Sequence, residues 1–206
     1  MTKVAALVLA AGQSSRFRKA GGAEETKLVA ILGGKPIVLR VVEAALASRA
    51  RPVIVVVGHA RGAVETALRG LPVTIVFNPD YATGLASSLR AGLTAIPDDA
   101  RGALALLGDM PNIEPRLLDS LIGALEAQPN AQAIAPAEGG RRGNPVLLRR
   151  TLFDRARRLV GDEGAKRLLG SLKEGDVVEI APPPGSDVSF DVDTPSDLAA
   201  SRQGRA

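Results

Sequence analysis

The sequence has no cysteine among its 206 residues and only one histidine. Without cysteine there can be no disulfide, no thiol nucleophile and no Cys-ligated zinc, and a single histidine excludes a cluster of histidine ligands. A chain without disulfides fits a reducing compartment, so we expect a cytoplasmic location. Any chemistry must rest on carboxylates, cationic side chains, hydroxyls and backbone groups.

Aromatic residues are also scarce, with four Phe, one Tyr and no Trp. Binding of single-stranded nucleic acid depends on aromatic stacking, so the net charge of +4 indicates a small anionic ligand and no nucleic-acid partner. No apolar run approaches the roughly 20 residues of a membrane-spanning helix, and we expect no membrane partner. The length and the 46% of hydrophobic residues predict one domain over residues 1–206.

Short apolar runs alternate with longer segments of helical spacing. The runs predict strands covered on both faces, at residues 4–10, 52–58, 73–77 and 103–108. The helical spacing covers residues 36–48, 60–70, 84–93 and 114–127. Strand, helix and strand in succession predict parallel pairing with right-handed crossovers. We therefore predict an α/β fold, Rossmann-like and doubly wound, with a mostly parallel sheet and helices on both faces.

The alternation of predicted strands and helices is less regular after Gln132. Further strands are predicted at residues 132–137, 145–150 and 176–181, and helices at 152–160, 164–172 and 193–201. In open sheets of this kind, ligands bind at the carboxyl ends of the strands. The residues that follow each predicted strand are therefore the candidates for function.

The first strand ends in the small and polar stretch AAGQSSR around Gly12. Small residues let backbone N–H groups approach phosphate oxygens, although such a stretch is also an ordinary turn. Neither the G-x-G-x-x-G fingerprint nor G-x-x-x-x-G-K-[ST] occurs, which argues against a dinucleotide dehydrogenase and a P-loop NTPase.

Acidic residues occur in GDMP, directly after a predicted strand, and in the segment SFDVDTPSDL. Asp109 could hold Mg²⁺ or simply cap a turn. Asp191 and Asp193 are two residues apart, which places both on one side of an extended segment and makes a metal-facing role plausible. Thr194 and Asp197, by contrast, have the spacing of a helix capping box and are interpreted as structural.

Two other polar features of the sequence have both a functional and a structural interpretation. The basic, glycine-rich stretch EGGRRGNPVLLRR predicts a loop entering a strand, in which Arg141 and Arg142 could grip a second anionic substrate or form an ordinary solvated face. His59 has no Ser or Cys partner that would suggest a catalytic triad, and we interpret it as structural.

Seven segments resemble the MobA-like nucleotidyltransferases and occur in the order seen in that family. They are LAAGQSSRF, KLVAILGGKPIV, NPDYATGLASSLRAGL, GDMP, GRRGNPVLL, GDEGAKRLL and DVDTPSDL. The closest resemblance is to the molybdenum cofactor cytidylyltransferase (MocA-type) branch. It implies a nucleotide-diphospho-sugar transferase-like fold, Mg²⁺ as cofactor, and transfer of a nucleotide from CTP to the phosphate of molybdopterin, with release of pyrophosphate and a molybdoenzyme as recipient of the product.

The resemblance also implies roles for individual residues. Nucleotide-binding positions are Leu9, Ala10, Ala11, Gly12, Gly84 and Leu85. Catalytic positions are Arg16, Lys27 and Asp109; the metal ligands are Asp109, Asp193 and Asp191; and the acceptor-binding positions are Arg142 and Asn144. The branch that uses guanosine usually shows LAGG and Asn-x-Asn, so LAAG and Asp191-x-Asp193 favour cytidine.

The loop before Lys27 departs from the family pattern. Ten residues, FRKAGGAEET, separate Arg16 from Lys27, about twice the usual distance, and Lys19 is the alternative candidate. Two further functions stay open at this point. One is nucleotidyl transfer with GTP or to a sugar phosphate or another small phosphate, and the other is a non-catalytic carrier of the molybdenum cofactor.

Overall fold

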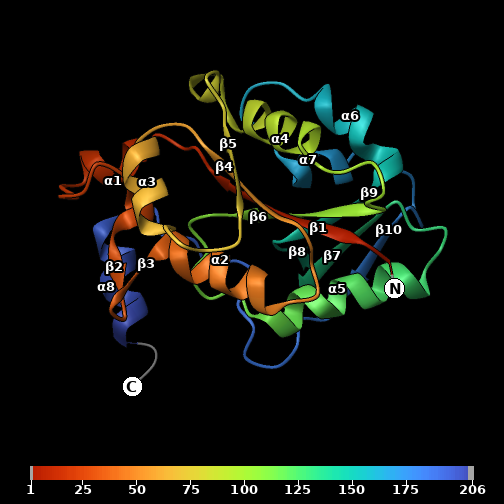
Figure 1. Cartoon of the computed structure of the whole chain (residues 1–206). Coiled ribbons are helices and arrows are strands. Elements are labelled where there is room, and N and C mark those ends of the chain that lie inside the picture. Colours follow the sequence, from red (N-terminus) through yellow and green to blue (C-terminus); the bar gives the residue numbers. More distant parts are fainter. Residues whose placement is uncertain (1, 204–206) are drawn as a thin grey trace.

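The computed structural model describes residues 2–203. Its main sheet runs in the order β10-β7-β9-β6-β1-β4-β5, with β8 paired to β7 (Figure 1). The strands are Val4–Ala10 (β1), Ile31–Leu32 (β2), Lys35–Pro36 (β3), Val53–Val57 (β4), Thr74–Phe77 (β5), Gly102–Leu107 (β6), Ala133–Glu138 (β7), Arg141–Arg142 (β8), Val146–Arg149 (β9) and Val177–Ile180 (β10). Strands β2 and β3 form a separate antiparallel hairpin.

Helices connect most of these strands. The α-helices are Ser15–Lys19 (α1), Ile37–Ala47 (α2), Arg61–Ala67 (α3), Leu85–Thr94 (α4), Pro115–Ala127 (α5), Phe153–Arg157 (α6), Ala165–Leu169 (α7) and Pro195–Gln203 (α8). The single 3₁₀ turns are Lys27–Val29 (η1), Tyr81–Thr83 (η2) and Arg150–Leu152 (η3). Among the described residues, none of these helices has the length and apolar content needed to cross a bilayer.

Strand β1 lies in the middle of the sheet, and all seven of its residues are buried. It pairs in parallel with β4 and with β6, and the register places Leu9 beside Leu107 and Ala10 beside Val57. Because neighbouring parallel strands end at the same rim, the segments that follow β1, β4 and β6 meet there. This is the rim at which the sequence predicts a site.

Helices cover both faces of the sheet, which confirms the predicted doubly wound α/β fold (Figure 1). Alternate side chains of β1 enter two apolar layers. Val8 packs in the layer with residues of α2, α3 and α5, whereas Leu7 packs in the layer with α4, α6 and α7. Because both faces of the strand are buried, all of its residues are apolar, and not only every second one.

The expectation that residues 73–77 are covered on both faces is wrong. Strand β5 is the edge of the sheet, and Phe77 is 45% exposed, with the Arg61 guanidinium 5.0 Å from the centre of its ring. An apolar run looks the same in sequence at an edge and in the centre of a sheet. The order in which the strands pair decides its place, and the strands after β5 all add on the other side of β1.

The glycine-rich stretch at 138–143 is a tight hairpin and not the open loop expected from sequence. Gly139 and Gly140 both have positive φ, 56° and 75°, and they turn the chain so that β8 pairs antiparallel with β7. Strand β9 then runs antiparallel between β7 and β6. The sheet is mostly parallel, as predicted, with β8 and β9 as the antiparallel strands among those described.

Helices α6 and α7 are shorter than the predicted 152–160 and 164–172. The residues between them form a turn in which Gly161 has a φ of 59°, a conformation that favours glycine. This turn packs against the start of α4, where the Ala86 backbone N–H donates to the carbonyl oxygen of Gly161 at 3.0 Å. It thereby brings the segment around Asp162 to the predicted rim.

A third, smaller apolar cluster closes one side of that rim. It consists of Phe17 from α1, Ala30, Leu32 from the β2–β3 hairpin, Ile37 and Val192. The hairpin and α8 lie side by side, so the C-terminal segment is held against the first loop (Figure 1). Neither α1 nor the hairpin was predicted, because segments of five and two residues are too short for a periodic pattern.

A buried pair of hydroxyls ties the two ends of the long loop together. Ser14, with a φ of 53°, lies just after the first strand, and its Oγ is 2.9 Å from Oγ1 of Thr26. Thr26 is fully buried, and the Lys27 backbone N–H donates to Ser14 Oγ at 3.2 Å. The ten residues between Arg16 and Lys27 can therefore bulge outward without moving Lys27 from the first loop.

We predict that Thr26→Val lowers the free energy of unfolding by about 1–3 kcal/mol, because it removes the buried hydroxyl that bonds Ser14 Oγ and accepts the Leu28 backbone N–H. Denaturant unfolding followed by circular dichroism measures this difference. Thr26→Ser should keep most of the stability, and Thr83→Val, which removes an exposed hydroxyl, should change it little. A Thr26→Val protein as stable as the parent would mean that the pair does not hold the loop.

Candidate active site

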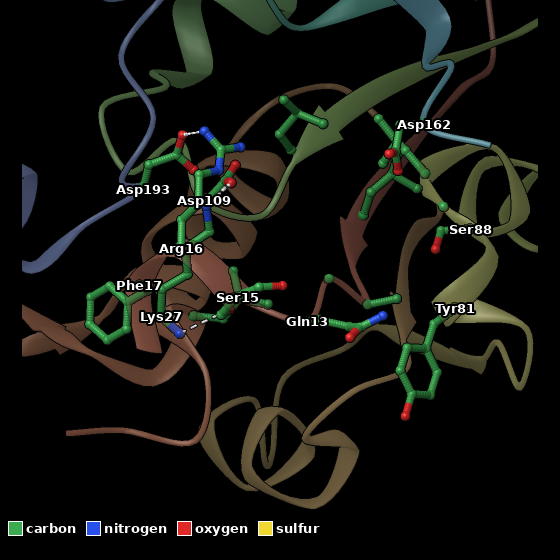
Figure 2. Close-up of a pocket in the computed structure, with 18 of the residues that line it drawn as sticks. Gln13, Ser15, Arg16, Phe17, Lys27, Tyr81, Ser88, Asp109, Asp162 and Asp193 are labelled. Atoms are coloured by element: carbon green, nitrogen blue, oxygen red, sulfur yellow. Dashed lines mark hydrogen bonds and ion pairs between the residues drawn. The ribbon is translucent and has the colours of Figure 1, made fainter. Parts of the chain in front are cut away.

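A pocket of about 460 Å³ lies at the carboxyl ends of β1 and β6. Figure 2 shows Asp109, Asp193 and Arg16 on one side of it, with Tyr81, Ser88 and Asp162 on the other and Gln13 between them. The pocket brings together most of the residues predicted from sequence. Those that line it are Leu9, Ala11, Gly12, Arg16, Lys27, Gly84, Leu85, Asp109 and Asp193.

The first loop leaves open space at Gly12. A Cβ atom built on this glycine meets no protein atom within 4 Å, although the residue lines the pocket. Gly84, on the opposite side, is constrained in another way: its φ is 111°, and a Cβ there would come within 2.3 Å of the Gly161 backbone. Glycine at position 84 thus keeps α4 close to the turn that carries Asp162.

Three carboxylates converge at one end of the pocket. Asp109 follows β6, Asp191 and Asp193 precede α8, and one ligand oxygen from each lies within 4.8 Å of the others. Val192, between the two later acids, is fully buried, and its backbone N–H donates to the Asp109 carbonyl oxygen at 3.0 Å. This confirms the predicted alternation, in which Val192 points inward while its two neighbours face the same side.

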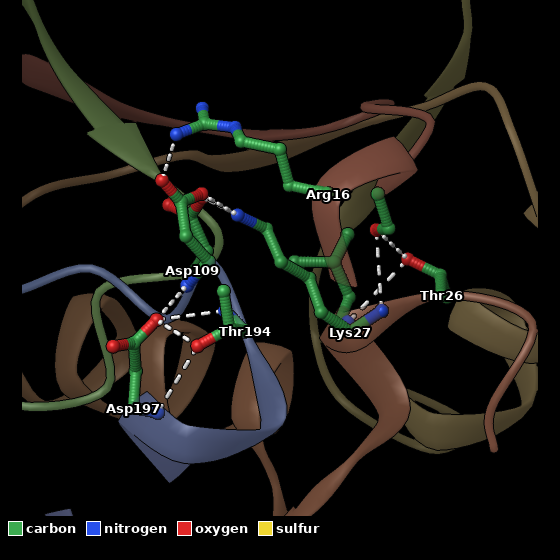
Figure 3. Close-up of polar contacts among 9 residues, drawn as sticks. Arg16, Thr26, Lys27, Asp109, Thr194 and Asp197 are labelled. Atoms are coloured by element: carbon green, nitrogen blue, oxygen red, sulfur yellow. Dashed lines mark hydrogen bonds and ion pairs between the residues drawn. The ribbon is translucent and has the colours of Figure 1, made fainter. Parts of the chain in front are cut away.

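The predicted capping box fixes the backbone next to these acids. The backbone N–H groups of Asp193 and Thr194 donate to one Asp197 carboxylate oxygen at 3.0 and 2.7 Å (Figure 3). In return, the Asp197 N–H donates to Thr194 Oγ1 at 3.3 Å. Asp197 is therefore occupied at the start of α8, whereas Asp191 and Asp193 turn their carboxylates toward Asp109, and Asp193 lines the pocket.

Two cations balance the acids. The Lys27 ammonium donates to Asp109 Oδ2 at 2.7 Å and to Asp193 Oδ1 at 2.8 Å, and Arg16 also pairs with Asp193 (Figure 3). The long loop therefore does deliver Lys27 to the rim. Lys19, the alternative candidate, is exposed at the end of α1 and does not line the pocket.

The pKa of Lys27 follows from two opposing effects. Burial lowers it, but the charge of Asp109 and hydrogen bonds to Asp109 and Asp193 outweigh burial, and the pKa is raised from 10.5. The ammonium therefore stabilises the fold below pH 10.5, and this contribution is lost as the pH rises through the raised pKa. At neutral pH, Lys27 is a cation.

Asp191 lacks such compensation. Burial and repulsion from Asp109 and Asp193 raise its pKa above 3.8, and Lys27 and Arg16 offset this only in part. The contribution of Asp191 to the free energy of unfolding consequently falls as the pH rises from 3.8 through the raised pKa of this group. Asp191 is therefore the least compensated carboxylate of the cluster, since Lys27 and Arg16 contact Asp109 and Asp193.

The donor set fits a divalent cation. Carboxylate oxygens are the ligands preferred by Mg²⁺ and related hard ions, and the three acids offer them within one small volume. Asp109 Oδ1 is buried without a hydrogen-bond partner among the described residues, so one ligand atom is uncommitted. A divalent ion would also relieve the repulsion that acts on Asp191.

Four predicted residues do not line this pocket. Asp191 belongs to the carboxylate cluster but is not among the lining residues. The side chain of Ala10 is buried in the apolar layer beneath it. Asn144 lines a second pocket of about 560 Å³, which shares Leu9, Leu85, Leu107 and Asp162 with the first. Arg142 lines neither pocket, and its Nε donates to Glu179 at 2.6 Å.

The structure adds residues that sequence reasoning did not select. Gln13, Tyr81, Ser88 and Asp162 line the first pocket, and Lys166 lines the second. All five lie in the segments quoted above or directly beside the predicted positions, but nothing in their spacing distinguishes them from ordinary loop and helix residues. His59, interpreted as structural, packs with its ring centre 6.0 Å from that of Tyr81 and does not line the pocket.

Several proteins are similar to this chain. Bifunctional protein GlmU of Sorangium cellulosum (strain So ce56) is 35% identical over 167 residues, which cover 78% of this chain and 34% of that protein. The chain thus spans about a third of the length of the GlmU proteins it matches.

Two solved structures match along nearly the whole chain. A nucleotidyl transferase from Methanothermobacter thermautotroptrophicus has a TM-score of 0.82 and 26% identity, over 99% of this chain and 98% of that one. Rv0371c from Mycobacterium tuberculosis H37Rv, in complex with manganese, has a TM-score of 0.78 and 26% identity, over 98% of each chain.

The family described as MobA-like NTP transferase domain matches residues 6–177. This range includes the Gly12 loop, Lys27, Asp109 and the wall with Tyr81, Ser88 and Asp162, and it ends before Asp191 and Asp193. The match covers most of the sequence and agrees with the observed fold. The chain therefore belongs to the MobA-like NTP transferase family.

Proposed function

We propose that this protein transfers CMP from CTP to the phosphate of molybdopterin and releases pyrophosphate. The observation that carries the proposal is the placement of three carboxylates, Lys27 and Arg16 at one end of a pocket whose other wall holds Gly84 and Leu85. Such a pocket offers charge neutralisation for a triphosphate at one end and room for a base and ribose at the other.

The reaction needs no protein nucleophile. An oxygen of the acceptor phosphate forms a bond to the α-phosphorus of the nucleotide, and the bond from that phosphorus to the bridging oxygen of the β-phosphate breaks. Because both reactants are anions, most of the barrier is lowered by positioning and charge neutralisation. Lys27 and Arg16 would neutralise the leaving pyrophosphate, and backbone groups from Leu9 to Gly12 would hold the nucleotide.

Asp109, Asp193 and Asp191 would hold Mg²⁺, which supplies Lewis-acid stabilisation of the phosphate oxygens when bound. The manganese complex of Rv0371c supports a divalent ion in proteins similar to this one. The uncommitted oxygen of Asp109 supports it from the chain itself. Asp197 is excluded as a ligand in this proposal because its carboxylate caps α8.

The choice of cytidine rests on LAAG and on Asp191-x-Asp193, both read from sequence. The base would lie on the side of the pocket lined by Tyr81, Ser88 and Gly84. A guanylyltransferase is the alternative for the base, and a sugar phosphate or another small phosphate is the alternative for the acceptor. A cofactor carrier without turnover would have no use for a metal-holding cluster.

The second pocket is the proposed acceptor site. It joins the first along Leu9, Leu85 and Leu107, so a bound acceptor would lie next to the nucleotide. Asn144 lines it together with Lys166, an exposed cation without an ion pair within residues 2–203, whereas its neighbour Arg167 pairs with Glu163. Lys166 is therefore the cation available for an acceptor phosphate. Arg142 could bind that phosphate only after its ion pair with Glu179 is broken.

We predict that the purified protein with Mg²⁺ and molybdopterin releases pyrophosphate much faster from CTP than from GTP, ATP or UTP. Asp109→Asn should lower this turnover by about 100-fold or more, because it removes the charge of a metal ligand without changing its shape. A coupled pyrophosphate assay measures both effects.

Asp99→Asn is the matched control, since it makes the same change in an exposed acid that pairs with Lys3, and turnover should stay normal. A preference for GTP would contradict the choice of base. Tight binding of the finished cofactor without metal-dependent turnover would instead establish the carrier function.

We further predict that Lys166→Gln raises the KM for molybdopterin by about tenfold and changes the KM for CTP much less, because it removes a charge-assisted hydrogen bond to the acceptor. Steady-state kinetics with each substrate varied in turn measure this. Lys173→Gln, an exposed lysine in neither pocket, is the control. If Arg142→Ala raises that KM and Lys166→Gln does not, the acceptor binds at the β8 edge.

A further inference from the structure

The Lys27 ammonium lies between Asp109 Oδ2 and Asp193 Oδ1, two of the carboxylate oxygens that could hold a divalent cation. Its nitrogen is 2.7 Å from one carboxylate and 2.8 Å from the other, and its side chain is only 13% exposed. Arg16, the other cation of the cluster, contacts Asp193 alone and is 77% exposed. The two cations therefore differ in kind: Lys27 is enclosed between two acids, and Arg16 lies at the rim.

Geometry prevents Lys27 and a divalent ion from using these oxygens together. Mg²⁺ binds oxygen at about 2.0–2.1 Å, so an ion bound by both oxygens would be about 4 Å or less from the Lys27 nitrogen. Two cations that close would repel and would compete for the same lone pairs. Metal binding through Asp109 Oδ2 and Asp193 Oδ1, the two oxygens that Lys27 contacts, therefore requires the ammonium group to move.

The backbone of Lys27 is anchored, and its side chain has a direction in which to move. The Lys27 N–H donates to Ser14 Oγ, and the residue begins the short turn η1, so its Cα is tied to the first loop. The four-carbon side chain lines the pocket, and rotation about its bonds can carry the ammonium away from the acids toward the open space beside Gly12.

We propose that Lys27 is the resident counter-ion of the metal site and that a divalent cation displaces it into the pocket, where it becomes available to an anionic ligand. Without metal, Lys27 offsets the repulsion among the three acids. When the metal is bound, the ion offsets this repulsion instead, and the Lys27 ammonium group moves into the pocket. By thermodynamic linkage, an anion that binds the displaced Lys27 strengthens metal binding by the same factor by which the metal strengthens binding of the anion.

This inference rests on the divalent-cation site of the proposed function, and it is independent of the base and of the acceptor. Its test is Mn²⁺ binding without any nucleotide, measured by electron paramagnetic resonance of the free ion, on the full chain, on Lys27→Met and on Arg16→Met. Both variants remove one positive charge and one contact with Asp193, but only Lys27→Met removes the group that lies between the two acids.

We expect Lys27→Met to bind Mn²⁺ about tenfold more tightly than the parent, and Arg16→Met to gain no more than about threefold. An equal gain in both variants would overturn the proposal, since it would reflect only the general loss of positive charge. An unchanged or weaker affinity of Lys27→Met would overturn it as well. Failure of all three proteins to bind Mn²⁺ would overturn the metal site together with this inference.

A second measurement does not depend on the stability of a variant. In the parent protein, the ¹⁵N-detected signal of the Lys27 ammonium group, assigned by its loss in Lys27→Arg, should change its chemical shift and exchange faster with water when Mg²⁺ saturates the site. The chain has six lysines, of which Lys3 and Lys35 pair with acids outside the pocket and serve as internal controls. A Lys27 signal that Mg²⁺ leaves unchanged would overturn the displacement.

Discussion

The site depends on holding three carboxylates together against their mutual repulsion. Asp109, Asp191 and Asp193 come within 4.8 Å of one another although more than eighty residues separate the first from the other two. Like charges this close are stable only beside cations, and the structure supplies Lys27 and Arg16 from the opposite end of the chain. The N-terminal loop and the C-terminal segment therefore meet for an electrostatic reason as well as an apolar one.

The fold fixes each member of this cluster by a local device that acts on the backbone and leaves the side chain available. Asp109 follows a central strand, and its carbonyl oxygen accepts the N–H of buried Val192, which aligns the two acidic segments. The capping box of Thr194 and Asp197 holds the residues after Asp193. The Ser14–Thr26 hydroxyl pair holds the backbone of Lys27, whose N–H donates to Ser14 Oγ. Precision at the site thus comes from buried backbone contacts at its margins.

The sequence predicted those parts of the molecule in which one strong pattern acts alone. Continuous apolar runs identified the parallel core, and the alternation around Val192 placed Asp191 and Asp193 on one side. It failed where the outcome depends on contacts between distant segments. The edge position of β5 and the burial of Lys27 between acids are set by tertiary pairing, which no local pattern records. Arg142 shows the same limit, because its pairing with Glu179 joins β8 to β10.

The same electrostatic constraint bears on how an anionic substrate could approach the pocket. A triphosphate would be repelled by three uncompensated carboxylates, so the cluster has to be neutralised before or while the phosphates arrive. A lysine bound between the acids offsets part of their charge but is then not available to the substrate. A divalent ion in its place offsets more of that charge and frees the lysine, so the pocket gains positive charge at the end where the phosphates would lie. Lys27 on an anchored backbone with a flexible side chain suits both arrangements, which a short or rigid cationic residue at that position could not.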